Sequence, residues 1–503
     1  METIAGLDPE ALNRARVSRD PRFDGKFFIA VTSTGIYCRP ICPSRYAKRA
    51  NVRFFGTPAA AEAAGFRPCL RCRPEAAPGT PAWLGTAAVV RRALRLINEG
   101  ALDEDSVDTL ANRLGIGARH LLRLFGRHVG ASPIAVAQTR RLHFAVCLLE
   151  QTSLPITQIA MAAGFGSCRR FNAAFRSAYQ RAPRDFRKAG RRIAARSSED
   201  VALRLAYRPP YDWAQVCDFL ATRAVPGVER VDARGYARTV ACEGGHALIC
   251  VRALPKVAAL ELRVTGAPPA ALLQISTAAR RVFDLAADPQ RIGAELARDV
   301  LIGPLVRQRP GLRIAGAWEP FECAVRAVLG QQVSVAAGRR FALRLVERAG
   351  IAIANGTDGL THLFPSPASL AATSLDGLGL TRSRAATLHA LARATLEGRV
   401  DFDAAPEEVV AALAALPGIG PWTAQYVALR ALGEPDALPS GDLVLRRLAA
   451  AGASPLSVRG LEARAHQWQP WRGYAVMHLW RAASENLARA PTRNRPSRTP
   501  AAA

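Results

Sequence analysis

Residues 415–433 read ALPGIGPWTAQYVALRALG, and this stretch decides the fold of the carboxy-terminal half of the chain. It overlaps the longest uncharged segment, residues 409–429, which is long enough for a membrane span. Four helix-breaking residues interrupt the middle of that segment: Pro417, Gly418, Gly420 and Pro421. Because a membrane-spanning helix needs continuity there, we expect two helices joined by a tight hairpin instead. The hairpin glycines would let backbone N–H groups approach a DNA phosphate closely.

The composition points to a folded protein that binds a polyanion. The chain has 503 residues, a length that predicts several domains. With 49% hydrophobic and 22% charged residues, it lies outside the range of collagen, mucins and fully disordered chains. The 68 Lys+Arg against 41 Asp+Glu give a net charge of +27, which attracts nucleic acid or an anionic membrane. No basic amphipathic or spanning segment supports the membrane, so we expect nucleic acid as the partner.

The first residues predict where the chain resides. METIAGLDPEALNRAR has no basic region followed by an apolar core, so nothing in it directs the chain through a membrane. We therefore expect a cytoplasmic, nucleoid-associated protein. In that reducing compartment the ten cysteines should be free, catalytic or metal-bound.

Four of these cysteines form two close pairs, Cys38 with Cys42 and Cys69 with Cys72. Thiolates at such short loop spacings are typical of tetrahedral zinc, so we expect Zn(2+) as the cofactor. Four thiolates around one zinc ion leave two net negative charges and electron-rich sulfurs. Most all-cysteine zinc sites only hold loops together, and a purely structural site is the first alternative.

The sequence around the cysteines favours chemistry over structure alone. FFIAVTSTGIYCRPICPSRYAKRANVRFF (27–55) and AGFRPCLRCRP (64–74) closely resemble the amino-terminal domain of the Ada adaptive-response proteins. The resemblance implies that Cys38 accepts a methyl group from a methylated DNA phosphotriester, once per molecule. Losing a negative charge that faces phosphates would strengthen DNA binding, so that damage itself acts as the switch. Candidate DNA-backbone contacts, which could equally be solvated surface residues, are Thr34, Arg39 and Arg45.

An imperfect repeat of about fifty residues follows the cysteines. SVDTLANRLGIGARHLLRLFGRHVGASP (106–133) and LPITQIAMAAGFGSCRRFNAAFRSAYQRAP (154–183) each contain a short apolar helix, a glycine turn and an arginine-rich helix. This order predicts two helix-turn-helix units. A plain helical bundle is the alternative, but it would not explain the recurrence of the glycine turns and of the Ser-Pro and Ala-Pro endings.

The repeat resembles the tandem helix-turn-helix module of AraC-type regulators, which also follows the metal domain in Ada. The resemblance implies a sequence-specific transcriptional activator that works with RNA polymerase. It also implies that two recognition helices bind in successive major grooves of double-stranded DNA. The arginines that we expect to contact DNA are Arg119, Arg123, Arg169 and Arg170.

The last 300 residues are similar to AlkA, the bacterial 3-methyladenine DNA glycosylase. Matching stretches occur in the same order from residue 203 to residue 480: LRLAYRPPYDWAQVCDFLATRAVPGVERV, FECAVRAVLGQQVSVAAGRR, the opening stretch, LPSGDLVLRR and WQPWRGYAVMHLW. The resemblance identifies the opening stretch as a helix-hairpin-helix motif, in which Gly418 and Gly420 bind DNA.

Asp442 follows the hairpin at the spacing used by this glycosylase superfamily. A carboxylate close to C1′ stabilises the positive charge that develops on the sugar and can orient the attacking water. Taken alone, Asp442 could be a helix N-cap, because it precedes Leu-Val-Leu-Arg. Bifunctional members place a nucleophilic lysine where this chain has Trp422, so no Schiff base can form. We therefore expect a monofunctional hydrolase that cleaves the N-glycosidic bond and leaves an abasic site.

The resemblance also implies a pocket for an extruded base. Trp422, Tyr426 and Trp480 match the pocket aromatics of AlkA, whose electron-rich faces attract cationic alkylated purines. Core packing is the alternative for any one of them. Where AlkA inserts a leucine into the gap left by the base, this chain has Gln332, whose amide must be desolvated to fill the gap.

Together these patterns predict a multidomain α+β protein that is mostly α. The expected parts are a zinc methyl-acceptor domain (1–76), a tandem helix-turn-helix module (83–190), a linker (191–200), an AlkA-type α+β domain (201–312), a helix-hairpin-helix glycosylase domain (313–488) and a disordered tail (489–503). The predicted function is alkylation repair combined with transcriptional activation. One rival is a damage-responsive transcription factor whose glycosylase fold is catalytically silent, and another is a DNA-tethered glycosylase whose zinc site is only structural. Without a Pro-Cys-His-Arg motif, repair of O6-methylguanine is not expected.

Overall fold

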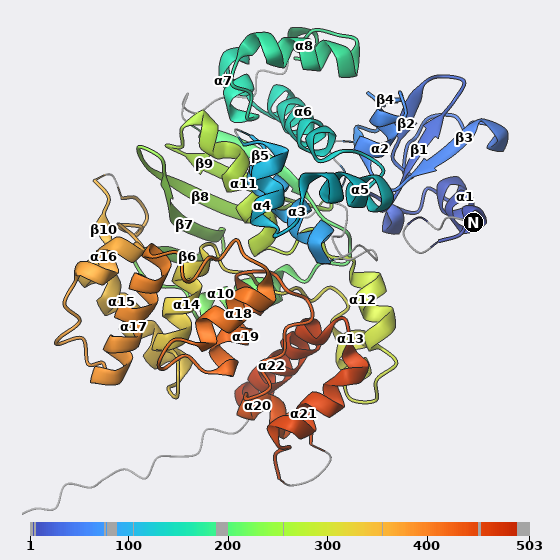
Figure 1. Ribbon diagram of the computed structural model, residues 1–503. Helices are drawn as coiled ribbons and strands as arrows, with labels where there is room; N and C mark the ends of the chain where they lie inside the picture. Colours follow the sequence, from blue (N-terminus) through green and yellow to red (C-terminus); the bar gives the residue numbers. More distant parts are fainter. Residues whose placement is uncertain are drawn as a thin grey trace, which may run out of the picture.

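The computed structural model shows several domains in contact with one another (Figure 1). It describes residues 4, 7–74, 77, 88–103, 105–187, 200–254, 256–354, 356–450 and 454–489. The predicted linker 191–200 lies outside the described residues except for Asp200, which begins a strand. The predicted tail lies outside them except for Arg489, which ends a helix. The predicted domain boundaries themselves remain predictions.

The amino-terminal domain is a small four-stranded sheet with two helices. Its strands are β1 (Phe28–Val31), β2 (Ile36–Cys38), β3 (Val52–Phe55) and β4 (Arg67–Pro68), in the order β3-β1-β2-β4. Its helical segments are α1 (Pro9–Val17), η1 (Pro21–Phe23), η2 (Arg49–Asn51) and α2 (Pro58–Ala63). Phe27 and Ile29 face one core, whereas Phe28, Ala30 and Tyr37 face another on the opposite side of the sheet. Because β2 and β4 pair in parallel, their ends bring cysteines from distant parts of the sequence together.

Helices α3 to α9 form the next module. They are α3 (Ala88–Glu99), α4 (Val107–Arg113), α5 (Ala118–His128), α6 (Pro133–Gln151), α7 (Ile156–Ala162), α8 (Cys168–Tyr179) and α9 (Pro183–Phe186). The two repeats form the predicted helix-turn-helix units, α4 with α5 and α7 with α8. Gly115 and Gly164 make their turns at φ of +68° and +79°, a backbone conformation that glycine adopts without strain. The 19-residue helix α6 joins the two units.

A five-stranded antiparallel sheet opens the carboxy-terminal half. Its strands are β5 (Asp200–Ala206), β6 (Glu229–Asp232), β7 (Gly235–Cys242), β8 (Gly245–Leu254) and β9 (Ala259–Thr265), in the order β5-β9-β8-β7-β6. The accompanying helices are α10 (Trp213–Ala221), η4 (Pro269–Ala271), α11 (Leu272–Val282), α12 (Pro289–Leu296) and α13 (Ile302–Gln308). This is the α+β domain that the sequence predicts.

The remaining described residues form a mainly helical domain. Its elements are α14 (Pro320–Leu329), α15 (Val335–Ala349), β10 (Ile351–Ala352), β11 (His362–Leu363), α16 (Pro367–Ala372), α17 (Arg382–Leu396), α18 (Pro406–Ala414), α19 (Pro421–Arg430), α20 (Leu443–Leu448), α21 (Val458–Ala465), η5 (His466–Trp468) and α22 (Arg472–Arg489). One apolar core runs from the second helix-turn-helix unit through the sheet into this domain. Among the described residues, no helix is both long and apolar enough to cross a membrane.

A buried charge network ties the sheet to the helical domain. Arg238 on β7 lies 2.8 Å from Glu322 on α14. Arg326 on α14 lies 2.8 Å from Glu229 on β6 and 2.7 Å from Glu322. Burial alone would raise the pKa of Glu229, but Arg326 and Arg238 lower it to about 2. The two domains are therefore held together by ionised groups, of which Glu229, Arg238 and Glu322 are buried, and removing one partner would leave another charge buried.

His478 on α22 makes the stability of this domain depend on pH. Its side chain is buried, and burial together with the nearby Arg309 guanidinium lowers the pKa of His478 to about 4. The unfolded chain therefore binds a proton near pH 6.5 that the folded chain rejects until about pH 4.

We predict that the free energy of unfolding falls by roughly 3 kcal/mol through His478 alone as the pH drops from about 6.5 to about 4. The contribution of His478 to stability is fully present above the pKa of the unfolded chain. It is lost as the pH falls toward the pKa of His478 in the folded chain. Urea unfolding at several pH values would measure it. The variant His478→Gln should show a shallower dependence across this window, and an unchanged slope would contradict the assignment.

Candidate functional site

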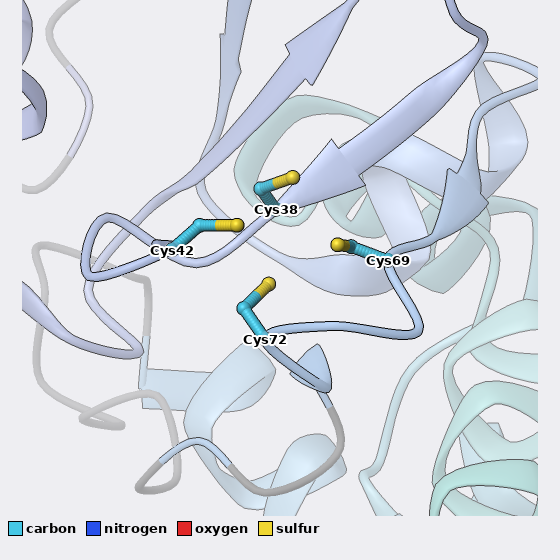
Figure 2. Close-up of side chains that lie close together, drawn as sticks. All are labelled: Cys38, Cys42, Cys69 and Cys72. Carbon is cyan, nitrogen blue, oxygen red and sulfur yellow. The ribbon is translucent and has the colours of Figure 1, made fainter. Parts of the chain in front are cut away.

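The four paired cysteines converge at one point of the amino-terminal domain (Figure 2). Cys38 ends β2, Cys42 follows in the next loop, and Cys69 directly follows β4. All four Sγ atoms lie within 4.8 Å of one another. Zinc–sulfur bonds of about 2.3 Å in a tetrahedron place the sulfurs about 3.8 Å apart, so this donor set fits a zinc ion. The predicted zinc cofactor is thereby confirmed.

The four thiols of the cluster perturb one another's ionisation. Hydrogen bonding to Cys42, and then to Cys69 and Cys72, raises the pKa of the Cys38 thiol, whereas hydrogen bonding to Cys38, and then to Cys69 and Cys72, lowers that of Cys42. The protonation states of the four groups are therefore coupled. A divalent cation would hold all four as thiolates.

The cysteines differ in their accessibility. Cys69 and Cys72 are buried, whereas Cys38 and Cys42 are half-buried. The backbone N–H of Arg39 donates to Cys72 Sγ at 3.3 Å, which draws electron density away from that sulfur. Accessibility therefore favours Cys38 or Cys42 as a nucleophile, and the hydrogen bond further disfavours Cys72.

The predicted backbone contacts of this domain lie in different environments. Thr34 is exposed in the turn between β1 and β2, and Arg45 is exposed in the loop after Cys42. Arg39 instead turns inward: its Nε donates to Asp24 at 2.8 Å, and its Nη1 donates to the Cys72 carbonyl at 3.1 Å. A phosphate contact by Arg39 stays a prediction, and it would require the guanidinium to leave Asp24.

A polar cluster connects β2, the strand that ends at Cys38, to the helix-turn-helix module. Tyr37, which precedes Cys38, donates its hydroxyl hydrogen to Glu62 on α2 at 2.8 Å. Glu62 also accepts a hydrogen bond from Thr139 on α6 at 2.6 Å and lies 3.6 Å from His143 one turn further along α6. The helix that joins the two DNA-reading units is therefore anchored next to the cysteine site.

The helix-turn-helix units present their arginines to solvent. Arg119 and Arg123 are exposed on α5, and Arg169 and Arg170 are exposed on α8. Ser167 lies just before α8 and caps it, because its side chain accepts from the backbone N–H of Arg170. Base or phosphate contacts by these arginines stay predictions.

The hairpin of residues 415–421 joins α18 to α19 as expected. Gly418 has φ of +87°, and a Cβ there would lie 2.0 Å from Thr387 Oγ1. The Thr387 hydroxyl donates to the Pro417 carbonyl at 3.0 Å, so it cannot easily move away. Only glycine fits at position 418, whereas the space around Gly420 is open, as close approach to a ligand requires.

Asp442 serves as a helix cap and also contacts a pocket aromatic. Its Oδ1 accepts from the backbone N–H groups of Val444 and Leu445, at the start of α20. Its Oδ2 accepts from Trp422 Nε1 at 3.1 Å. The capping bonds fix the carboxylate and the indole bond aims its second oxygen, so the two interpretations of Asp442 are compatible.

The three predicted pocket aromatics lie side by side. Trp422 stacks on Tyr426, with ring centroids 5.3 Å apart and an angle of 18° between the planes. Tyr426 and Trp480 lie 6.0 Å apart at 51°. A fourth ring, Phe219 of α10, stacks on Trp480 at 6.5 Å and 24°. The cluster therefore draws on both domains of the carboxy-terminal half.

Two arginines lie beside these rings. The Arg430 Nη1 donates to the Tyr426 hydroxyl at 2.8 Å, and the Arg430 guanidinium lies 4.8 Å from the centre of Phe219. Arg223 lies over the same Phe219 ring at 3.8 Å. Burial alone would raise the pKa of Tyr426, but Arg430 and Arg223 lower it below its usual value. The phenol is thus a better hydrogen-bond donor than a free tyrosine.

The sequence reasoning missed Phe219, Arg223 and Arg430. Phe219 and Arg223 lie within the stretch 203–231 already singled out by its resemblance, four residues apart. That spacing was the available signal. Phe219 and Arg223 lie against α19 because of the way two domains pack, and a local sequence pattern cannot predict such packing.

The predicted gap-filling residue lies next to the hairpin. Gln332 is exposed at φ of +54° in the turn between α14 and α15. The neighbouring Gln331 side chain donates to the Gly418 carbonyl at 2.9 Å and to Thr423 Oγ1 at 3.0 Å. The turn that carries Gln332 is therefore tied to the hairpin of residues 415–421, while insertion of Gln332 into DNA and phosphate binding by the hairpin stay predictions.

Four family models match the chain in sequence order. They are the metal binding domain of Ada (residues 11–75), a helix-turn-helix domain (110–189), the AlkA N-terminal domain (202–319) and the HhH-GPD superfamily of base excision DNA repair proteins (325–455). Fold and sites together define a DNA repair enzyme joined to a zinc-containing DNA-binding regulator.

Curated relatives cover either the whole chain or one half of it. A probable bifunctional transcriptional activator/DNA repair enzyme AlkA of Mycobacterium tuberculosis is 41% identical over 94% of this chain and 96% of its own length. DNA-3-methyladenine glycosylase 2 of Escherichia coli is 37% identical over 55% of this chain and 95% of its own. The bifunctional activator and repair enzyme Ada of Escherichia coli is 34% identical over 36% of this chain and 49% of its own. The chain belongs to the family of bifunctional transcriptional activator/DNA repair enzymes of the AlkA type.

We predict that Trp422→Phe lowers the turnover number for base release by about 10- to 100-fold while changing KM little. The aromatic stack is kept, but the hydrogen bond that aims Asp442 is lost, and such bonds to charged groups contribute about 1.5–3 kcal/mol. The measurement is base release from alkylated DNA under saturating substrate. Trp471→Phe is the matched control, because it removes an indole bond to Glu295 and leaves the bond between Trp422 and Asp442 in place. A loss confined to KM would contradict the positioning role.

Proposed function

We propose that this protein senses methylated DNA phosphates through Cys38, activates transcription through α5 and α8, and excises 3-methyladenine and related alkylated bases with Asp442. The observation that carries the glycosylase assignment is the Asp442 carboxylate, fixed at a helix start and bonded to an aromatic stack beside a DNA-binding hairpin. The name of the Escherichia coli relative supplies the substrate class.

In the proposed excision reaction, the hairpin glycines Gly418 and Gly420 bind the DNA backbone and Gln332 fills the gap left by the extruded base. Trp422, Tyr426 and Trp480 stack on that base. The bond between the base and C1′ breaks, and its electron pair leaves with the base. The Asp442 carboxylate stabilises the resulting positive charge and orients a water molecule, whose oxygen bonds to C1′ and whose proton passes to the surrounding water.

In the proposed sensing reaction, Cys38 Sγ attacks the methyl carbon of a phosphotriester. A sulfur–carbon bond forms, the carbon–oxygen bond breaks, and the phosphodiester anion leaves with the electron pair. Zinc, when bound, keeps the four sulfurs ionised at neutral pH. The half-exposed position of Cys38 at the end of β2 supports its choice as nucleophile.

The transfer lowers the negative charge of a surface that faces phosphates, which strengthens DNA binding. Thr34 and Arg45 are proposed backbone contacts of the sensor. Arg119, Arg123, Arg169 and Arg170 are proposed DNA contacts of the two reading helices. RNA polymerase as a partner and association with the nucleoid belong to the same proposal, because an activator acts at promoters.

We predict that Asp442→Asn lowers base release by about 100-fold or more, because the neutral amide cannot stabilise the charge on the sugar. Asparagine also caps helices, so α20 should persist. The readout is free alkylated base released from labelled DNA. Asp8→Asn, which changes the cap of α1 in the other half of the chain, is the matched control. Undiminished release would favour a glycosylase fold that only binds DNA.

We predict that Cys38→Ser abolishes methyl uptake by the protein, because a serine hydroxyl is a far weaker nucleophile than a thiolate. The measurement is label bound covalently to protein after incubation with DNA carrying labelled methylphosphotriesters. Cys242→Ser, a half-buried cysteine outside the cluster, should retain full uptake. Uptake that survives Cys38→Ser would contradict Cys38 as the acceptor and leave Cys42, the other half-buried cysteine of the cluster, to be tested.

A further inference from the structure

Four buried charged residues lie between two domains. One is the amino-terminal domain, here called the sensor, and the other is the domain of the five-stranded sheet, here called the sheet domain. Asp24 and Lys26 of the sensor are 5% and 9% exposed, and Arg208 and Asp288 of the carboxy-terminal half are 1% and 2% exposed. Charges so deeply buried are costly unless they are paired. Their contacts therefore show what holds the sensor in place.

These residues pair across the boundary between the two halves. Lys26 Nζ lies 2.5 Å from Asp288 Oδ2, at the start of α12. The Arg208 Nε donates to the Asp24 carbonyl at 3.0 Å, and its Nη1 donates to the Ala286 carbonyl at 2.8 Å. In Figure 1, α12 accordingly lies beside the amino-terminal domain. The loop between η1 and β1 is thus bound by the sheet domain from two directions.

The same loop reaches the cysteine cluster. The Asp24 carboxylate pairs with the guanidinium of Arg39, the residue that follows Cys38. Arg39 in turn donates to both the sulfur and the carbonyl of Cys72. A continuous chain of contacts therefore runs from the metal-binding sulfurs through Arg39 and Asp24 to Arg208 of the glycosylase half.

The charges along this chain are unbalanced. Lys26, Arg39 and Arg208 carry three positive charges, whereas Asp24 and Asp288 carry two negative ones. The zinc–thiolate cluster supplies two further net negative charges at its other end. Counting the cluster, this chain of contacts carries a net charge of −1, and methyl transfer would bring it to 0. The attraction between the cluster and Arg208, the cation that the sheet domain contributes to this chain of contacts, would thereby weaken.

We propose that the sheet domain of the glycosylase half is the docking platform of the methyl sensor, held through Lys26–Asp288 and Arg208–Asp24, and that methylation of Cys38 weakens this docking. The second part rests on the proposed methyl transfer, whereas the first does not. Methylation of the sensor by damaged DNA would thereby release the sensor from the glycosylase half.

Hydrogen exchange of the intact chain tests the docking. Asp288→Asn removes the charge but keeps a side chain able to cap α12, where Asp288 accepts from the Arg291 N–H. Exchange of residues 20–27 should rise by about 10-fold or more, because Lys26 is left buried and unpaired. Asp8→Asn is the matched control: it changes the cap of α1 in the same domain but outside residues 20–27. Equal exchange in both variants would overturn the docking.

A second variant separates docking from misfolding. In Lys26→Met/Asp288→Asn neither charge is left alone, so protection of residues 20–27 should return most of the way to that of the unmodified protein. Strands β7 and β8, which lie away from the ion pair, should exchange equally in all variants. A double variant no better protected than Asp288→Asn alone would contradict the pairing.

Methylation tests the coupling. The protein is incubated with a duplex carrying one methylphosphotriester, the DNA is digested by a nuclease, and the methyl group on Cys38 is verified by mass spectrometry. Faster exchange of residues 20–27 in the methylated protein, and not in Cys38→Ser treated identically, is the expected result. Methylated protein with unchanged exchange would overturn the coupling. Absence of the methyl group would refute the proposed sensing reaction and its coupling, while the docking is decided by the charge variants.

Discussion

Pairing of buried charge is the constraint on which this architecture depends. The chain carries a large positive excess, yet several of its carboxylates and guanidinium groups are hidden from water at the contacts between domains. Glu229 and Glu322 join the sheet to the helical domain through Arg238 and Arg326. Each such group is tolerable only while its partner is present, so the domains are held in specific orientations and not merely tethered.

The orientation matters because the aromatic cluster that includes the proposed base-binding rings comes from two domains. Phe219 on α10 belongs to the sheet domain, while Trp422, Tyr426 and Trp480 belong to the helical one. A rotation at the buried charge network would separate these rings without altering either domain. The carboxylate Asp442, in contrast, is fixed locally by its own helix and by Trp422. The position of the proposed catalytic carboxylate therefore depends on local structure, whereas the proposed base-binding cluster depends on how two domains pack.

Much of the site could be predicted from the sequence where a short spacing carries the chemistry. The four cysteines and the hairpin glycines are recognisable from short local spacings, whereas the roles predicted for Cys38 and Asp442 needed the family resemblance as well. The three aromatics needed the family resemblance. The inward turn of Arg39 could not be predicted, because its partner Asp24 lies 15 residues away and contacts it only after the sheet has folded. Arg223 and Arg430 could not be predicted either, because packing between domains sets their positions beside the rings.

The single helix α6 has a consequence for the DNA that this protein can read. Its 19 residues extend over about 28 Å, which is close to the roughly 34 Å of one DNA turn. Because both reading units attach to one continuous helix, their separation and their relative rotation are set together. One inserted residue would turn the second reader by about 100° around the axis of α6 while advancing it by only about 1.5 Å. The length of α6 therefore fixes the rotation between the two units more strictly than the distance between them. The two half-sites of the DNA must accordingly face the protein at one fixed angle around the DNA axis.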